Sequence, residues 1–76
     1  MKLWLIRRME HVGYDEYDAK VIAAHSEEGV RGLAAINTGD EGKDAWLSSG
    51  RSMITEVGLA RDPEHEQVIL ESFNAG

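Results

Sequence analysis

The 76-residue chain has no cysteine, a single proline and no long hydrophobic run. Without cysteine it has no disulfide framework, no thiol nucleophile and no cysteine-based zinc site. The longest apolar run is Leu3–Ile6. That run is too short for a membrane span, which needs about 20 residues, or for a secretory signal, whose apolar part has about 7–15. We therefore expect a cytoplasmic protein that has no contact with membranes.

Positive charge is also scarce, because eight Lys and Arg residues accompany fourteen Asp and Glu residues and give a net charge of −6. A protein that binds the phosphate backbone needs a basic face, so this balance argues against direct nucleic-acid binding. Residues 1–38 hold six acids and five bases, whereas residues 39–76 hold eight acids and three bases. The net charge is thus −1 in the first half and −5 in the second, which predicts a localised acidic surface.

The length allows a single domain, residues 1–76, with a thin core. Scaling with mass predicts a folded surface of roughly 4,600 Å², which leaves little room for an enclosed active-site cavity. Hydrophobic residues make up 42% of the chain, which is typical of a globular protein rather than a disordered one.

The hydrophobic pattern predicts strands at residues 2–8 and 17–24, joined by a polar hairpin connection at 9–16. Leu3–Ile6 is apolar on both faces, which favours a central strand. In the second strand, alternation places Tyr17, Ala19, Val21 and Ala23 on one face and Asp18 and Lys20 on the polar one. Two further strands are expected at residues 53–59 and 68–73, with Asn74-Ala75-Gly76 as a tail.

A helix is expected after Ser26, whose hydroxyl can accept a hydrogen bond from a first-turn amide. Glu27 and Glu28 then suit the first turn of that helix. Val30, Leu33 and Ala34 share one helical face, and residues 37–39 end the helix. The segment 45–47 is either a short helical turn or a docking segment. The order ββαββ predicts an α+β fold in two layers, with one helix on a four-stranded, mainly antiparallel sheet.

No sequence motif predicts catalysis or a cofactor. His11, His25 and His65 lack the i, i+4 spacing of a helical metal site, so we expect neither a metal nor a cofactor. Ser48, Ser49 and Ser52 lie in a turn-like segment without the surroundings of a nucleophilic serine. A minimal enzyme that pairs His11 or His65 with a carboxylate is the hypothesis that a shared concave site would favour.

The acidic half contains two clusters of carboxylates. The first comprises Asp40, Glu41 and Asp44, and the second comprises Asp62, Glu64 and Glu66. One interpretation is a surface that imitates a phosphate backbone and occupies the basic groove of a nucleic-acid-binding protein. The other is that the charge keeps a small protein soluble. Trp46 lies beside the first cluster, where it is either an aromatic anchor for a partner or part of the core.

Three stretches have distinctive sequences: Lys-Leu-Trp-Leu-Ile-Arg-Arg at 2–8, Val-Gly-Tyr-Asp-Glu-Tyr-Asp at 12–18 and Glu-Ser-Phe-Asn-Ala-Gly at 71–76. Together they resemble a group of short uncharacterised proteins encoded by bacteriophages and bacterial mobile elements. By size and acidity the chain is similar to anti-CRISPR proteins, several families of which block the DNA-binding surface of a surveillance complex. The resemblance implies no catalytic residues.

We therefore expect a non-enzymatic inhibitor in the cytoplasm of a bacterial host cell. Its partner would be a nucleic-acid-binding defence complex of the CRISPR type, contacted through both acidic clusters and Trp46. The alternative is a phage accessory or scaffold protein, either a monomer or a homodimer formed through an exposed strand edge.

Overall fold

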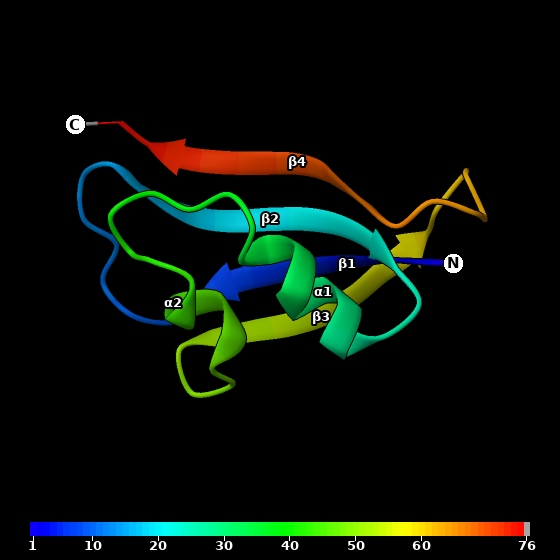
Figure 1. Ribbon diagram of the computed structural model, residues 1–76, viewed down its shortest axis with the longest axis horizontal. Coiled ribbons are helices and arrows are strands. Elements are labelled where there is room, and N and C mark those ends of the chain that lie inside the picture. Colours follow the sequence, from blue (N-terminus) through cyan, green and yellow to red (C-terminus); the bar gives the residue numbers. More distant parts are fainter. Residues whose placement is uncertain (76) are drawn as a thin grey trace.

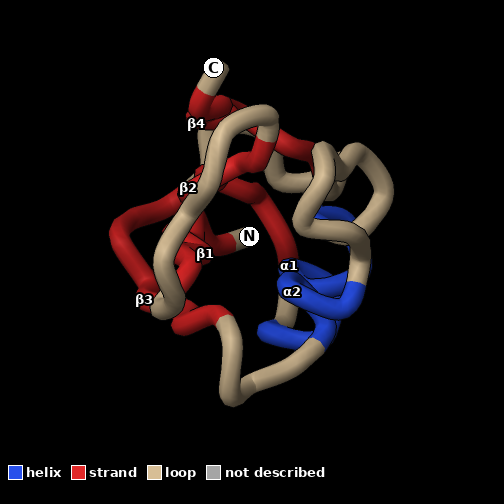
Figure 2. Tube along the Cα trace, turned by 90° about the vertical axis from the view of Figure 1, so that its left-hand side faces the viewer, coloured by secondary structure: helices blue, strands red, loops and turns tan. Residues whose placement is uncertain are grey.

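Four antiparallel strands form one open sheet in the order β3-β1-β2-β4, and two helices lie on the same side of it (Figures 1 and 2). The computed structural model describes residues 1–75. Its elements are β1 (Lys2–Arg8), β2 (Glu16–Ala24), α1 (Glu27–Ala34), α2 (Asp44–Leu47), β3 (Ser52–Leu59) and β4 (Gln67–Asn74). The expected two-layer α+β fold is confirmed, and the segment around 45–47 is a short second helix.

Strand β1 occupies the centre of the sheet, as its apolar run predicts, because it pairs with β2 on one side and with β3 on the other. Ile6 is completely buried under the helices, and Leu5 points to the opposite, uncovered face. Strand β4 is one residue longer at each end than the pattern predicts. Asn74, expected in the tail, pairs with Glu16 instead, and Gly76 lies outside the described residues.

The expected alternation of β2 is wrong at its start. The register of β2 against β4 shifts between Tyr17 and Ala19, so Asp18 has no partner of its own. This bulge brings Tyr17 to the same side as Lys20, where its ring packs against the core. Lys20 is consequently buried rather than on a polar surface, and only 1% of it is exposed.

Helix α1 begins as its sequence predicts. The Ser26 hydroxyl accepts a hydrogen bond from the Gly29 amide at 3.2 Å, and Val30 and Ala34 are fully buried against the sheet. The core is small, and its fully buried hydrophobic cluster comprises Ile6, Ile22, Ala24, Val30, Ala34, Ala45 and Trp46. The accessible surface is 4610 Å², in agreement with the value expected from mass. The fold therefore offers surfaces rather than a deep cavity.

Candidate partner-binding surface

Lys20 joins the sheet to both helices from inside the molecule. Its ammonium donates to the carbonyl oxygens of Ala34, the last residue of α1, at 2.9 Å, and of Asn37 in the segment that follows. It also lies 2.8 Å from a carboxylate oxygen of Glu71 on β4, and over the rings of Tyr17 and Trp46. These oxygens satisfy a buried cation that would otherwise be unstable. The positive charge of Lys20 is thereby removed from the surface.

The guanidinium groups of Arg8 and Arg31 are also occupied by hydrogen bonds within the molecule. The side chain of Arg8 is only 3% exposed, and it donates to the Tyr17 carbonyl and to the carboxylates of Glu10 and Glu16. Arg31 donates to the carbonyls of Trp46, Ser48 and Ser52 and to the Ser52 hydroxyl. These bonds hold α1 against the end of α2 and the start of β3.

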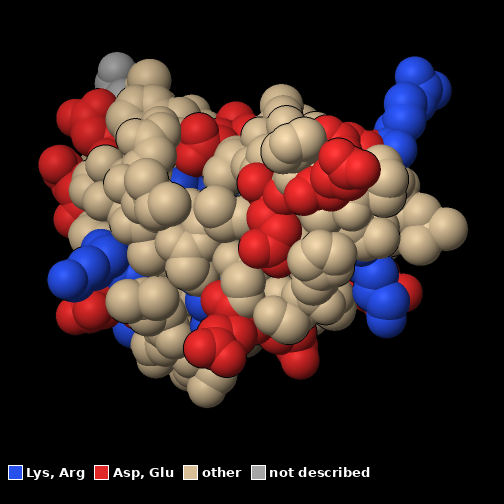
Figure 3. Space-filling view, turned by 45° about the vertical axis from the view of Figure 1, so that its right-hand side comes forward, with Lys and Arg blue, Asp and Glu red and all other residues tan. Residues whose placement is uncertain are grey.

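The surface is consequently more one-sided in charge than the composition suggests. Among residues 1–75, three cations are exposed and outside any ion pair, namely Arg7, Lys43 and Arg61. Seven carboxylates are exposed and outside any ion pair: Asp15, Glu27, Glu28, Asp40, Asp44, Glu64 and Glu66. Figure 3 shows carboxylates across the middle of one face, with the cations at its margins.

The first predicted cluster becomes an exposed patch with a different composition. Asp40 and Asp44 are exposed, and the Asp40 amide donates to the Asp15 carbonyl at 2.8 Å, which brings Asp15 alongside. We call Asp15, Asp40 and Asp44 the loop patch. Asp15 adopts a φ of 60° in the β1–β2 connection. No sequence pattern predicts that this connection meets the segment after α1.

Two residues predicted with this cluster have internal contacts instead. Glu41 is half-buried, and its carboxylate accepts hydrogen bonds from the amides of Gly39 and Tyr17 and from the Trp46 indole. Trp46 is 0% exposed and belongs to the core. Trp46 is therefore part of the core, and its side chain has no exposed surface with which to anchor a partner.

The second predicted cluster lies in the β3–β4 turn and joins the first turn of α1. A Glu66 carboxylate oxygen accepts a hydrogen bond from the His25 amide at 2.8 Å, so Glu66 lies beside Glu27 and Glu28. We call Glu27, Glu28 and Glu66 the helix-start patch; Glu64 is exposed in the same turn as Glu66. The sequence marks the first two only as helix-start residues, because their meeting with the turn is a long-range contact.

Asp62 mainly holds the turn together. Its carboxylate accepts a hydrogen bond from the Glu64 amide at 2.9 Å and lies 2.9 Å from Nδ1 of His65. These two contacts hold the pKa of Asp62 below its ordinary value. Asp62 is therefore less available to a partner than Glu64.

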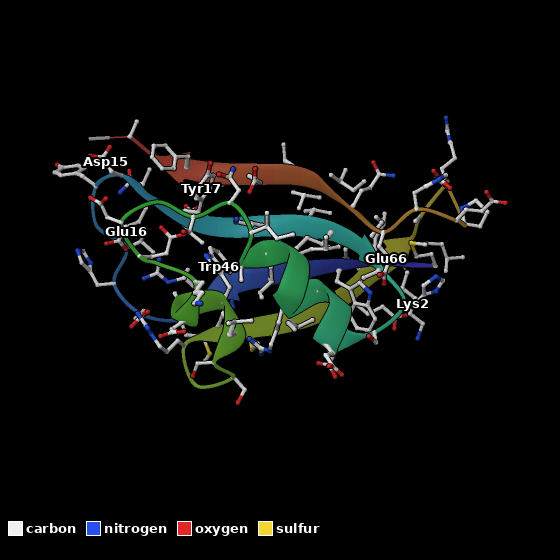
Figure 4. All side chains as sticks on the ribbon, viewed as in Figure 1. Lys2, Asp15, Glu16, Tyr17, Trp46 and Glu66 are labelled. Carbon is white, nitrogen blue, oxygen red and sulfur yellow. The ribbon has the colours of Figure 1, made fainter. Side chains whose placement is uncertain are left out.

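The two patches are not one continuous surface. Figure 4 places Asp15 near one end of the molecule and Glu66 toward the other. A partner that contacts both patches must therefore present two separate sets of basic groups.

The loop patch depends on the absence of a side chain at Gly39. A Cβ there would lie 2.1 Å from the Asp15 carbonyl oxygen, which is backbone and has little freedom to move. We expect Gly39→Ala to separate the two loops and lower the thermal midpoint. Gly32→Ala is the matched control, since nothing lies within 4 Å of its Cβ position in α1. Alanine should stabilise that helix by about 0.5–1 kcal/mol. Equal thermal midpoints for the two variants would contradict this geometry.

Glu10 bridges Arg51 and Arg8 at the end of β1. Desolvation raises the pKa of Glu10, but hydrogen bonds from Arg51 and Arg8 outweigh it and hold the pKa below its ordinary value. A carboxylate of this kind stabilises the folded state above its unfolded pKa and loses that contribution as the pH falls through its folded pKa.

We therefore expect Glu10→Gln to lower the urea midpoint at neutral pH and to leave it unchanged in strong acid. The exposed Glu64→Gln variant is the control and should match the parent protein under both conditions. A Glu10→Gln deficit of the same size in acid and at neutral pH would show that the ion pairs are not its cause.

The three histidines lie apart on the surface. His65 contacts Asp62, but both belong to an exposed turn. His11 lines a depression in the β1–β2 connection with Val12, Gly13, Tyr14 and Asn74. Across residues 1–75, no three His, Asp or Glu side chains are grouped closely enough to hold a metal ion. The described part of the chain also contains no helix of the length and apolarity that a membrane crossing requires.

Comparisons of this chain with protein-family models, with curated proteins and with solved structures found no match.

Proposed function

We propose that this protein is a non-enzymatic inhibitor that binds the basic, nucleic-acid-binding surface of another protein. One observation carries the proposal: Lys20 and Arg8 are buried and the half-buried Arg31 is bonded internally, whereas seven carboxylates among residues 1–75 are exposed and outside any ion pair. A surface of this kind attracts Lys and Arg side chains over long distances and repels nucleic acid. It therefore suits competition with nucleic acid better than direct binding to it.

The presence of two separate acidic patches supports mimicry of a phosphate backbone. The molecule is 35 Å long, and the two patches lie at different places along it. Carboxylates of both patches can therefore meet basic groups that are spaced along an extended groove. The exposed residues Asp40, Asp44, Glu64 and Glu66 are the proposed contacts, with Asp15, Glu27 and Glu28 beside them.

Within this class, we propose that the partner is a CRISPR surveillance or effector complex in the cytoplasm of a bacterial host cell. The basis is the resemblance of the chain to phage-encoded proteins and, in size and acidity, to anti-CRISPR proteins. Such complexes hold nucleic acid in positively charged channels, which is the surface chemistry that the exposed carboxylates complement.

The test is displacement of labelled target DNA from a purified effector complex, followed by fluorescence anisotropy. We expect the protein to release the DNA in a concentration-dependent manner and to prevent its rebinding. Unchanged DNA binding and unchanged interference at saturating protein would overturn the proposal for that complex.

A second candidate function is a scaffold or accessory protein with no role against a defence system. A specific observation favours it: the face of the sheet that carries Leu5, Val21 and Leu70 is apolar, and no helix packs on it. The displacement assay separates the two functions, because a scaffold that uses this face has no reason to compete with DNA.

A further inference from the structure

The face of the sheet away from the helices is formed by regular cross-strand rows. The central row runs across all four strands and contains Thr55, Leu5, Val21 and Leu70. Their neighbours Ile54, Ile6 and Ile22 point to the other side, into the core or against it, so the central row faces away from the helices. One further row lies on each side of it, and Figure 2 shows no helix over this face.

This uncovered face is apolar and shallow. Leu70 is 65% exposed, and a depression of about 120 Å³ lies between Leu5, Val21 and Leu70. A second depression, of about 330 Å³, is lined at the other end by Leu3 and Ala23. Exposed apolar surface of this extent is typical of an interaction site.

The charge on this face differs from that of the rest of the molecule. Arg7, at one end, is the only ionisable residue among the twelve in the three rows. The chain as a whole carries a charge of −6, so two copies repel each other least when these faces meet. Both acidic patches then stay at the outside of the pair.

The arrangement of charge also fits a two-fold stack. Arg7 lies at the end of the face where β1 finishes, and Asp62 borders the depression at the opposite end, with Arg61 beside it. If a second copy is turned end for end, Arg7 of each copy lies over the end that holds both Asp62 and Arg61 of the other, and the two Arg7 side chains are kept apart. The same rotation pairs the central rows, Leu5 and Val21 against their equivalents.

The size of the face is sufficient for such a pair. Four strands about 4.8 Å apart and about 25 Å long cover roughly 500 Å². Two stacked faces remove about 1,000 Å², which is the size of a weak, reversible pair rather than of a permanent one. Sheets with apolar inner faces pack in this way in β-sandwiches.

We propose that a second copy of this chain covers the uncovered face, and that the protein is a homodimer whose two sheets stack through Leu5, Val21 and Leu70. This inference does not depend on the proposed function. The dimer would display two sets of acidic patches facing away from each other.

Sedimentation equilibrium across the micromolar range tests the proposal with three variants. The parent protein should be a dimer that dissociates on dilution. Leu70→Lys and Thr55→Lys, on opposite edge strands of the central row, should each shift the equilibrium at least tenfold toward monomer. Ile36→Lys is the control, because Ile36 is 77% exposed but lies outside the sheet. It makes the same charge change as the other two and should leave the dimer intact.

The outcomes are distinguishable because both test residues are already exposed and circular dichroism reports folding of each variant separately. Since lysine lowers the net negative charge, weaker association cannot come from added overall repulsion. A parent protein that is monomeric throughout overturns the proposal. A dimer that persists with either Leu70→Lys or Thr55→Lys also overturns the proposal. That result would mean that the two copies meet through another surface or that this face binds a different partner. Dissociation of the Ile36→Lys control would also overturn it.

Discussion

Replacing Lys20 with methionine is expected to lower the free energy of unfolding by about 3–5 kcal/mol, the usual cost of removing one partner of a buried ion pair. Methionine keeps the length of the side chain but leaves the Glu71 carboxylate without its cation. It also leaves the Ala34 and Asn37 carbonyls without their donor. A chain of this size has a total stability of about 4–11 kcal/mol, so the substitution should remove a large share of it.

Urea denaturation followed by circular dichroism measures this effect. Lys43→Met is the matched control, because Lys43 is exposed and forms no ion pair within residues 1–75. Its free energy of unfolding should differ from that of the parent protein by no more than about 0.5 kcal/mol. Glu71→Gln should cost less than Lys20→Met, since the Glu71 side chain is 23% exposed and water can replace part of its contact. A Lys20→Met variant as stable as the control would contradict the buried position of this ammonium.

Reversing the charge of the loop patch is expected to weaken inhibition of the effector complex by at least about 100-fold. Placing like charges together at an interface costs several kcal/mol, and each 1.4 kcal/mol is tenfold in affinity. The double variant Asp40→Lys, Asp44→Lys suits this test because both side chains are exposed and form no ion pair with any residue from 1 to 75. Glu41 is left unchanged, since its carboxylate holds Gly39, Tyr17 and Trp46.

A second double variant, Val57→Lys with Ile36→Lys, separates the patch from overall charge. Val57 and Ile36 are 54% and 77% exposed and belong to neither patch. This control changes the net charge half as much as the patch variant. If only the total charge mattered, its inhibition would weaken about tenfold; if the loop patch binds the partner, it should change less than threefold. DNA displacement curves for the three proteins decide between these results.

The fold can be predicted from the sequence where local pattern decides structure. The apolar Leu3–Ile6 run placed β1 at the centre of the sheet, and Ser26 marked the start of α1. Lys20 was assigned wrongly because alternation treats every lysine as polar. The physical reason for its burial is the meeting of α1 carbonyls with the Glu71 carboxylate from β4, and no local pattern encodes that meeting.

In the candidate surface, too, local features could be predicted from the sequence and long-range contacts could not. The acidic residues Asp40, Asp44 and Glu64 are exposed, as a solvated cluster predicts. Their grouping with Asp15, Glu27 and Glu28 depends on contacts between segments distant in the chain, such as Glu66 with the His25 amide. The apolar face that the helices leave uncovered could not be predicted from the sequence either. Leu5, Val21 and Leu70 form one row only when β1, β2 and β4 pair.

The central claim is that the exposed carboxylates bind a basic surface. The most direct test is the dissociation constant of the protein for a DNA-free effector complex, measured by calorimetry from low to physiological and then higher salt. Contacts between exposed charges are screened by salt, so we predict that the dissociation constant rises at least tenfold across this series. A dissociation constant that does not change with salt would contradict an acidic, phosphate-like contact.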